Sequence, residues 1–289
     1  MPAFRLAVLT LLAMLAFAAN SVLCRQALER TTLDAASFTS LRLISGALVL
    51  WLIVYWKQGT GRMEGSWGSA LALFAYAAGF SFAYISLPTG TGALLLFGTV
   101  QLTMLAAGLL HGERPGPWPL AGMLLALVGL AYLLSPGLEA PQPLGAILMI
   151  GAGIAWGLYS LRGRGERHPL QATAGNFLRS IPPAVGLGLI ALPWLQWDAQ
   201  GALLALASGA LASGIGYAIW YAALPGLRAS SAATVQLSVP LLAAAGGALI
   251  LAEPITPRLL LASLAILGGI ALVLLTPWQS PSSNSNGRP

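Results

Sequence analysis

Long apolar runs follow one another along almost the whole chain, and charged residues, prolines or glycines bound each run. The runs are about 20 residues long, the length that an α-helix needs to cross the hydrocarbon core of a bilayer. The alternation of polar and apolar positions that would indicate a membrane β-barrel does not run through the chain. The pattern predicts an all-α fold of ten membrane-spanning helices, near residues 4–23, 35–56, 67–87, 89–110, 118–134, 142–161, 170–192, 200–223, 228–251 and 258–276.

The composition agrees with an integral membrane protein. Of the 289 residues, 57% are hydrophobic and 8% are charged, whereas a soluble domain carries about 25% charged residues. The segments between the apolar runs are short and leave no room for a separate soluble domain. The stretch 278–289 is rich in Ser, Asn and Pro, and we expect it to form a disordered cytoplasmic tail. Cys24 is the only cysteine, so no intramolecular disulfide bond can form.

The basic residues are unevenly distributed over the predicted loops. If the N-terminus is cytoplasmic, nine Lys and Arg residues fall on the inner side of the membrane, namely Arg5, Lys57, Arg62, Arg114, Arg162, Arg164, Arg167, Arg228 and Arg288. Three fall on the outer side, namely Arg25, Arg30 and Arg258. Because cytoplasmic loops carry an excess of Lys and Arg, we expect a bacterial inner-membrane protein with both termini in the cytoplasm. The net charge of +6 then reflects topology, and no nucleic-acid partner is expected.

The two halves of the chain repeat one sequence pattern. A shift of 137 residues aligns them over most of their length, and a slip of two residues extends the match into the fourth span. The matched positions are Arg25 and Arg162, Arg42 and Arg179, Gly79 and Gly216, Tyr84–Pro88 and Tyr221–Pro225, Thr99–Leu102 and Thr234–Leu237, and Glu113 and Glu253.

Each repeat contains five spans, with expected boundaries at 1–137 and 138–277. Because five is an odd number, the second repeat must enter the membrane from the opposite side. Inverted repeats of this kind are typical of secondary transporters, in which the substrate binds near the midplane at the repeat interface. Two similar halves can exchange inward-open and outward-open arrangements, so the pattern predicts transport by alternating access.

Several of these residues also resemble a known family. They are Ala18-Ala19-Asn20 in the first span, Arg42 and Arg179 in the second and seventh, and Leu251–Thr256 before the last. The pattern resembles the drug/metabolite transporter superfamily and its EamA-type exporters, and it is most similar to the bacterial aromatic amino acid exporters (the YddG type). The resemblance covers residues 4 to about 275. It implies export of amino acids or similar metabolites through a central cavity lined largely by spans 1, 3, 4, 6, 8 and 9.

Ionisable groups are expensive inside a membrane and therefore mark candidate functional positions. Only Arg42 and Arg179 lie well inside predicted spans. Each could meet a substrate carboxylate, or it could bind backbone carbonyls or reach toward the interface. Because the two are repeat-equivalent, a structural or gating role is favoured for both.

No Asp or Glu lies deep in a predicted span, which argues against direct proton coupling through an intramembrane carboxylate. Glu113 and Glu253 each shortly precede a proline that leads into the next span. A carboxylate is favourable near the positive N-terminal end of a helix. We therefore expect each of them to stabilise the helix that follows it.

Polar and aromatic side chains are the better candidates for binding. In span 8, Ser213, Tyr217 and Trp220 share one helical face. The amides of Gln101 and Gln236 lie in the middle of their spans, where facing the lipid would be expensive. Aromatic rings could stack on the side chain of a substrate, while amides and hydroxyls bind its amino and carboxylate groups. The predicted substrate-binding residues are Asn20, Tyr76, Phe80, Gln101, Trp156, Tyr159, Ser213, Tyr217, Trp220 and Gln236.

Packing between helices is the competing explanation for the same residues. Gln101 and Gln236 are repeat-equivalent, which suits a structural interhelical bond. Tyr84 and Tyr221 lie near span ends, where we expect packing or an interfacial belt. Pro240 should kink span 9, because proline removes a backbone donor, and a kink there could serve a gate.

These observations predict a secondary transporter that exports aromatic and other large neutral amino acids. The alternatives are export of another metabolite or a drug-like cation, or a scaffold or channel that does not transport. His111 and His168 are the only histidines and lie in loops of different repeats, so neither a metal site nor catalysis is indicated. No cofactor is expected, and the expected partners are a small-molecule substrate and the lipid bilayer. A monomer suffices for this mechanism, although a dimer is compatible with it.

Overall fold

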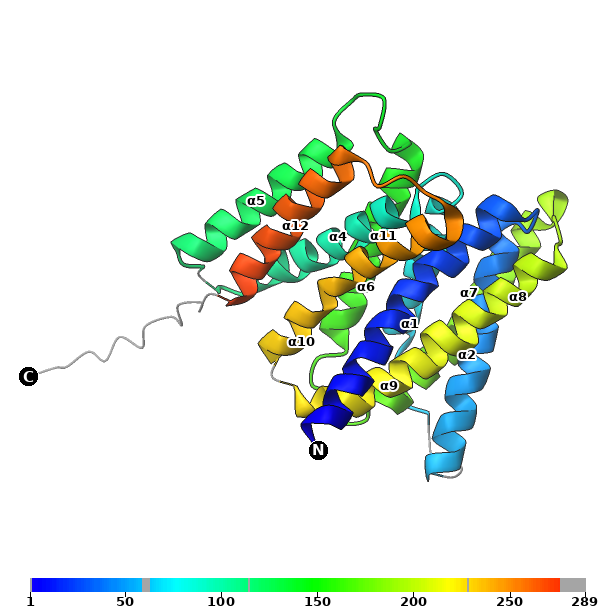
Figure 1. The fold of residues 1–289 in the computed structure, drawn as a ribbon. Coiled ribbons are helices and arrows are strands. Elements are labelled where there is room, and N and C mark those ends of the chain that lie inside the picture. The colour runs from blue at the N-terminus through cyan, green and yellow to red at the C-terminus, as the bar shows by residue number, and fades with distance from the viewer. Residues whose placement is uncertain (1, 59–62, 114, 228, 276–289) are drawn as a thin grey trace, which may run out of the picture.

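The computed structural model describes residues 2–58, 63–113, 115–227 and 229–275, and this part of the chain contains helices and no strand (Figure 1). The α-helices are α1 (Ala3–Arg30), α2 (Ala35–Gln58), α3 (Trp67–Ala83), α4 (Thr89–Leu110), α5 (Pro117–Leu134), α6 (Pro143–Arg162), α7 (Pro169–Ala191), α8 (Ala199–Ala207), α9 (Gly216–Ala223), α10 (Ala229–Gln236), α11 (Ser238–Leu251) and α12 (Pro257–Leu275). Three short segments join them, namely η1 (Leu192–Trp194), the π-helix η2 (Ser208–Ile215) and η3 (Leu224–Gly226).

The prediction of an all-α membrane fold is confirmed. Within the described residues, nine helical stretches are long and apolar enough to cross a membrane, and the remaining predicted span corresponds to the 17-residue apolar helix α3. Span 8 is one continuous stretch of α8, η2 and α9, and span 9 consists of α10 and α11.

Some predictions concern residues that the structure does not describe, and one predicted helix end differs from the structure. The expected tail 278–289 and the residues Arg62, Arg114, Arg228 and Arg288 lie outside the described residues. The predicted end of the first span at residue 23 was wrong, because α1 continues to Arg30. Arg25 and Arg30, which were expected in a loop, therefore lie in the last turns of a helix. The repeat boundary at residue 137 stays a prediction.

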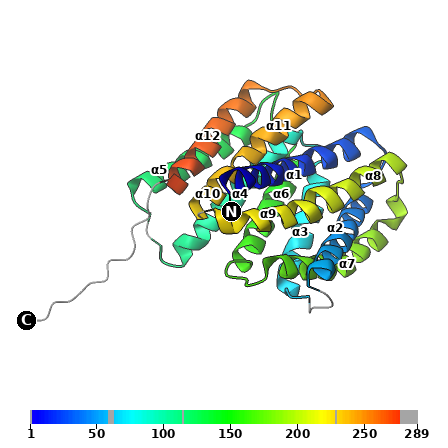
Figure 2. The same ribbon diagram turned by 60° about the horizontal axis from the view of Figure 1, so that its bottom comes forward.

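The two halves pack against each other in a symmetric way. Helices α2 and α7, α4 and α11, and α5 and α12 form three contacts between repeat-equivalent elements. The contact of α3 with α6 has its counterpart in the contact of α1 with α9, and that of α2 with η2 corresponds to that of α3 with α7. Figures 1 and 2 show α5 and α12 side by side at one edge of the bundle. This arrangement fits two inverted copies related by a pseudo-two-fold axis.

Two faces of the bundle are used below. The N-terminal face is the end at which α1 begins, and α4, α6, α9 and α12 end there (Figure 1). The opposite face carries the connections 31–34, 84–88, 135–142, 192–198 and 252–256.

Span 9 is interrupted near its proline, as expected. Helix α10 ends at Gln236 and α11 begins at Ser238, two residues before Pro240. Proline has no backbone N–H to donate to the carbonyl four residues earlier, which is that of Gln236. The helix is therefore interrupted next to Gln236, whose carbonyl cannot accept a hydrogen bond from residue 240.

Helices α5 and α12 approach closely at glycines. A Cβ atom placed on Gly269 would lie 2.5 Å from the carbonyl oxygen of Gly122 and 2.8 Å from the backbone nitrogen of Ala126. A Cβ atom on the neighbouring Gly268 would meet nothing within 4 Å. Small residues of this kind allow membrane helices to pack backbone to backbone.

We expect Gly269→Ala to lower the thermal stability of the purified protein in detergent, because the added methyl group forces α5 and α12 apart. Overpacking of a well-packed contact costs about 1–3 kcal/mol. Gly268→Ala is the matched control and should leave the melting temperature unchanged or slightly higher, since alanine favours a helix. Equal melting temperatures for the two variants would show that the glycine contact does not hold the helices together.

Candidate functional site

A cavity of about 800 Å³ lies inside the bundle. Residues of α1, α3, α4, α6, α7, η2, α9 and α10 line it, together with Leu274 at the end of α12. Its lining includes the exposed residues 162–166 at the N-terminal face, so the cavity opens there. All ten predicted substrate-binding residues line this one cavity, namely Asn20, Tyr76, Phe80, Gln101, Trp156, Tyr159, Ser213, Tyr217, Trp220 and Gln236. Their role in binding stays a prediction, but the structure brings them together.

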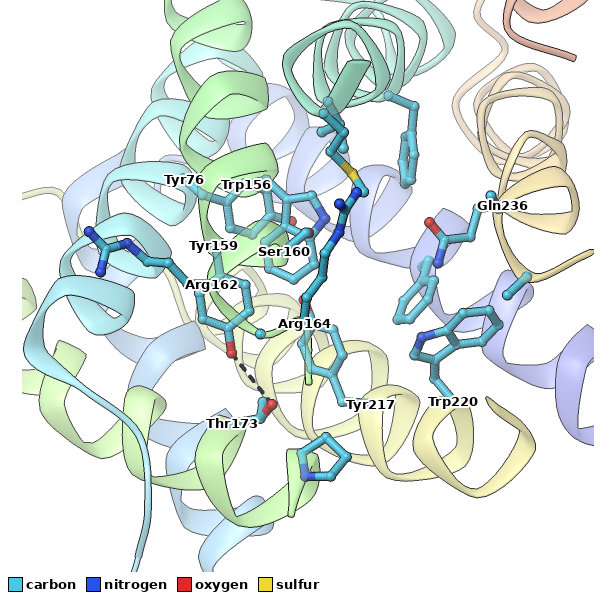
Figure 3. Close-up of a pocket in the computed structure, with 18 of the residues that line it drawn as sticks. Tyr76, Trp156, Tyr159, Ser160, Arg162, Arg164, Thr173, Tyr217, Trp220 and Gln236 are labelled. Atoms are coloured by element: carbon cyan, nitrogen blue, oxygen red, sulfur yellow. Dashed lines mark hydrogen bonds between the residues drawn. The ribbon is translucent and has the colours of Figure 1, made fainter. Parts of the chain in front are cut away.

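Aromatic rings form a connected wall of the cavity, with Trp156 at its centre. The ring of Trp156 lies 4.7 Å from that of Tyr76, 5.0 Å from that of Tyr159 and 5.7 Å from that of Tyr217. Figure 3 shows the rings of Tyr76, Trp156 and Tyr159 together, with Trp220 and Gln236 across the cavity. These rings come from α3, α6 and α9, so the wall joins elements of both repeats.

A chain of hydrogen bonds lies at the inner end of the cavity. The Ser208 hydroxyl donates to Asn20 Oδ1 at 2.6 Å, and Asn20 Nδ2 donates to the Tyr76 hydroxyl oxygen at 3.4 Å. The guanidinium of Arg42 donates to the same hydroxyl oxygen through Nη2 at 2.9 Å. Four helical elements are thereby connected, namely η2, α1, α3 and α2.

A second polar cluster lies where α6, α7 and α9 meet. The Tyr159 hydroxyl donates to Thr173 Oγ1 at 3.4 Å, and Asn176 Nδ2 donates to the Tyr159 oxygen at 3.4 Å. The hydroxyls of Thr173 and Tyr221 are 2.9 Å apart. The dashed line in Figure 3 marks the bond between Tyr159 and Thr173.

The sequence interpretation missed part of this second cluster. Tyr221 was assigned to packing or an interfacial belt, but it lines the cavity, as do Thr173 and Asn176 of α7. The seventh span was not expected to contribute to the lining. A signal was present, because Thr173 and Asn176 are three residues apart and therefore share one face of the helix.

Four charged residues line the mouth of the cavity at the N-terminal face, namely Glu113, Arg162, Arg164 and Glu166. The arginines were interpreted only as determinants of topology. In Figure 3, the side chain of Arg164 extends into the space between Tyr159 and Gln236, while that of Arg162 points to the side. A Cβ atom on Gly68 would lie 2.8 Å from Arg162 Nη1, so this side chain rests on the start of α3.

The opposite face is closed by a network around Arg25. Arg25 Nε lies 3.2 Å from Glu253 Oε1, and each of these two side chains is 11% exposed. Arg25 Nη1 also donates to the carbonyl oxygens of Tyr84 and Ile85, both at 3.0 Å. The remaining oxygen of Glu253 accepts the backbone N–H of Thr89, the first residue of α4, at 2.8 Å.

The prediction that Glu253 stabilises the helix that follows it was therefore wrong. Its carboxylate stabilises the N-terminus of α4 in the first repeat and not that of the following helix α12. At α12 the hydroxyl of Thr256 accepts the backbone N–H of Leu259 instead. The side chain of Glu113 lies against Gly108, and its expected effect on α5 stays a prediction.

The repeat-equivalent arginines have different surroundings. Arg179 Nη1 donates to the carbonyl oxygens of Glu64 at 2.8 Å and Gly175 at 3.0 Å, which fits a structural role. Arg42 is 2% exposed, and within the described part of the chain it has no carbonyl partner and its Nε and Nη1 atoms form no hydrogen bond. Neither arginine nor Pro240 lines the cavity.

Metal binding has no support in the described residues, where no group of three or more His, Cys, Asp or Glu could hold an ion. An apolar helical bundle around a cavity that opens at one face is typical of multi-pass membrane transport proteins. The chain belongs to the EamA-like transporter family, whose model matches residues 5–135 and 143–275, once in each half.

Individual relatives agree with this assignment. The chain is 58% identical to the uncharacterized protein PA1977 of Pseudomonas aeruginosa over 95% of this chain and 96% of that protein. It is 28% identical to the threonine/homoserine exporter RhtA of Escherichia coli K12 over 81% of this chain and 79% of that protein. A crystal structure of a protein with 21% identity matches with a TM-score of 0.65 over 93% of this chain and 98% of that chain, which shows the fold.

We expect Glu253→Ala to lower the melting temperature of the protein in detergent, because it leaves Arg25 and the N-terminus of α4 without their shared acceptor. Hydrogen bonds to charged groups contribute about 1.5–3 kcal/mol, which corresponds to a decrease of roughly 3–12 °C. Glu139→Ala, in the exposed connection between α5 and α6, is the control and should have no effect. A stable Glu253→Ala variant would mean that the network around Arg25 is not needed to close this face.

Proposed function

We propose that the protein exports aromatic and other large neutral amino acids across a bacterial inner membrane by alternating access. The observation that carries this proposal is the composition of the cavity wall, which combines contiguous aromatic rings with amides and hydroxyls at the repeat interface. A ring placed among such neighbours gains about 0.5–1.5 kcal/mol per ring pair beyond burial. The volume of about 800 Å³ lies within the range of small-molecule sites.

The direction of transport is supported by the position of the opening. The cavity opens at the N-terminal face, which carries Lys57 at the end of α2, Arg162 at the end of α6, and Arg164 and Arg167 in the connection after α6. An excess of basic residues marks the cytoplasmic side of membrane proteins. A cavity open to the cytoplasm can load substrate from inside the cell, as export requires.

Small hydroxylated amino acids are the second candidate substrates. This candidate is favoured by the similarity to the threonine/homoserine exporter of Escherichia coli. Threonine has the same amino and carboxylate groups as phenylalanine, so hydroxyls and amides of the cavity could bind either. Only the aromatic wall distinguishes them, because threonine has no ring to stack. A drug-like cation, a channel or a scaffold that does not transport would each give a different result in the first experiment.

We expect the purified protein in proteoliposomes to catalyse saturable flux of phenylalanine and tryptophan, and slower flux of threonine. Trp156→Ala should raise the KM for phenylalanine about 5- to 10-fold, because ring contacts are lost. Trp118→Ala, which removes a 64% exposed ring on α5, is the control and should leave the KM unchanged. Threonine flux that is unaffected by Trp156→Ala, without phenylalanine flux, would favour the second candidate.

Flux of a quaternary ammonium compound alone, or no flux at all, would contradict the amino acid proposal. Flux that does not saturate with substrate would indicate a channel.

Alternating access requires that each face of the bundle can close. Arg25 and Glu253 close the opposite face, and their repeat equivalents are Arg162 and Glu113. In the described structure, Arg162 and Glu113 line the open mouth and form no ion pair with each other. By the symmetry of the repeats, Glu113 and Arg162 would pair at the start of span 9 when the N-terminal face closes.

Charge reversal tests this pairing. We expect Arg162→Glu to reduce the maximal rate of phenylalanine flux at least about 10-fold, because two like charges then meet at the closing face. The double variant Arg162→Glu with Glu113→Arg should recover much of the rate. Arg167→Glu, in the exposed connection that follows Arg162 but outside the cavity lining, is the control. If the double variant is no better than Arg162→Glu alone, the two side chains do not pair during transport.

A further inference from the structure

The guanidinium of Arg42 lies behind the cavity wall, next to the lining residues Tyr76 and Phe80, and has no counter-ion among the described residues. It is 2% exposed, and none of the ion pairs in the described part of the chain includes it. Its charge lies over the rings of Phe80, at 4.8 Å, and Tyr76, at 5.1 Å. Both of these residues line the cavity. A buried cation is expensive unless an anion or several hydrogen-bond acceptors compensate it, and among the described residues the Tyr76 oxygen is the only acceptor.

The hydroxyl of Tyr76 accepts hydrogen bonds on the side of Arg42 and can donate one into the cavity. A phenolic oxygen has two lone pairs and one hydrogen. Arg42 Nη2 and Asn20 Nδ2 both donate to the Tyr76 oxygen, at 2.9 and 3.4 Å. No described residue accepts a hydrogen bond from the Tyr76 hydroxyl in return. Its hydrogen is therefore free to be donated to a molecule in the cavity that Tyr76 lines.

The neighbours of Tyr76 hold this donor in place. Asn20 Oδ1 is occupied by the Ser208 hydroxyl at 2.6 Å, so the amide nitrogen is directed toward Tyr76. Arg42 both positions the phenol oxygen and polarises it, because a donor that itself accepts from a cation becomes stronger. The acidic residues that line the cavity, Glu113 and Glu166, lie at its mouth. The inner end thus carries a donor and a net positive charge.

We propose that the Tyr76 hydroxyl binds the carboxylate of the transported molecule. Arg42 positions and polarises this hydroxyl through its hydrogen bond to the phenolic oxygen. This inference rests on the proposed function and adds an orientation to it. The carboxylate lies at the inner end of the cavity beside Tyr76, and the side chain of the substrate lies against the wall around Trp156, whose ring is 4.7 Å from that of Tyr76. Arg42 is a positioning residue and Tyr76 is the binding group.

Phenylalanine and phenylalaninamide distinguish this arrangement, because they share the ring and the amino group and differ in the carboxylate. The measurement is the KM for labelled phenylalanine in proteoliposomes and the inhibition constant of unlabelled phenylalaninamide in the same assay. The inhibition constant of phenylalaninamide divided by the KM for phenylalanine reports the preference for a carboxylate. This ratio does not depend on how much active protein is present. The wild-type protein should prefer phenylalanine clearly.

Tyr76→Phe removes one hydroxyl and keeps the ring. It should raise the KM for phenylalanine about 10-fold or more, since hydrogen bonds to charged groups are worth at least that factor, while the inhibition constant of phenylalaninamide stays nearly constant. Arg42→Gln should reduce the ratio at least as strongly. Arg42→Lys should restore part of the preference, because it keeps the charge without the planar donor geometry.

Two further variants act as controls for the position of the charge. Arg179→Gln removes the repeat-equivalent guanidinium, which is bonded to backbone carbonyls, and should leave the ratio unchanged. Arg164→Gln removes the cation that extends from the mouth. If Arg164→Gln abolishes the preference while Arg42→Gln and Tyr76→Phe retain it, the carboxylate binds at the mouth and the inference is overturned.

The outcomes also separate this inference from the proposed function. Saturable phenylalanine flux with an unchanged ratio in Tyr76→Phe would overturn the carboxylate site and leave amino acid export standing. Equal affinity of the wild-type protein for phenylalanine and its amide would do the same. Absence of flux for every amino acid would overturn both proposals.

Discussion

The hydrocarbon core of a bilayer offers no hydrogen-bond partners, and most of this structure follows from that constraint. Backbone groups are satisfied by helices, and two irregularities within the described spans are the interruption at Leu237, shortly before Pro240, and the π-helix η2. Polar side chains inside the bundle must then find partners on other helices. Asn20, Tyr76 and Ser208 do so at one end of the cavity, and Tyr159, Thr173 and Asn176 do so beside it. The bond from Ser208 to Asn20 also joins the two repeats, and residues of both polar clusters line the cavity.

Much of the architecture could be predicted from the sequence, because the length of apolar runs and the internal repeat depend on local pattern alone. The aromatic wall was predictable for a similar reason. Tyr217 and Trp220 share a helical face, and Trp156 lies too deep in its span for an interfacial belt. Helix boundaries were less predictable. The end of α1 was placed seven residues early because Arg25 was interpreted as a loop residue, whereas its charge is compensated by Glu253 and by carbonyl oxygens.

Contacts across the repeats could not be predicted. Glu253 precedes α12 in the chain, so local reasoning assigned it to that helix, but its carboxylate stabilises α4. The internal repeat also led to a wrong expectation that Arg42 and Arg179 have the same surroundings. Arg42 and Arg179 occupy equivalent positions, and equivalence favoured one structural role for both. The structure gives Arg179 two carbonyl acceptors and Arg42 a tyrosine hydroxyl, so the two halves have diverged around a shared scaffold. Only the three-dimensional neighbours distinguish the pair.

The π-helix η2 interrupts span 8, while the equivalent span of the first repeat, α3, is a regular α-helix of 17 residues. A π-turn holds more residues per turn than an α-helix and is found mostly at functional sites. In the alternating-access cycle proposed above, two identical halves would give two end states of equal free energy, and the empty protein would divide its time evenly between them. A wide turn in one half removes that degeneracy, so the empty protein should rest in a preferred state. Substrate binding energy, or a gradient, then has to drive the cycle away from that resting state, and the rates of the two half-cycles need not be equal.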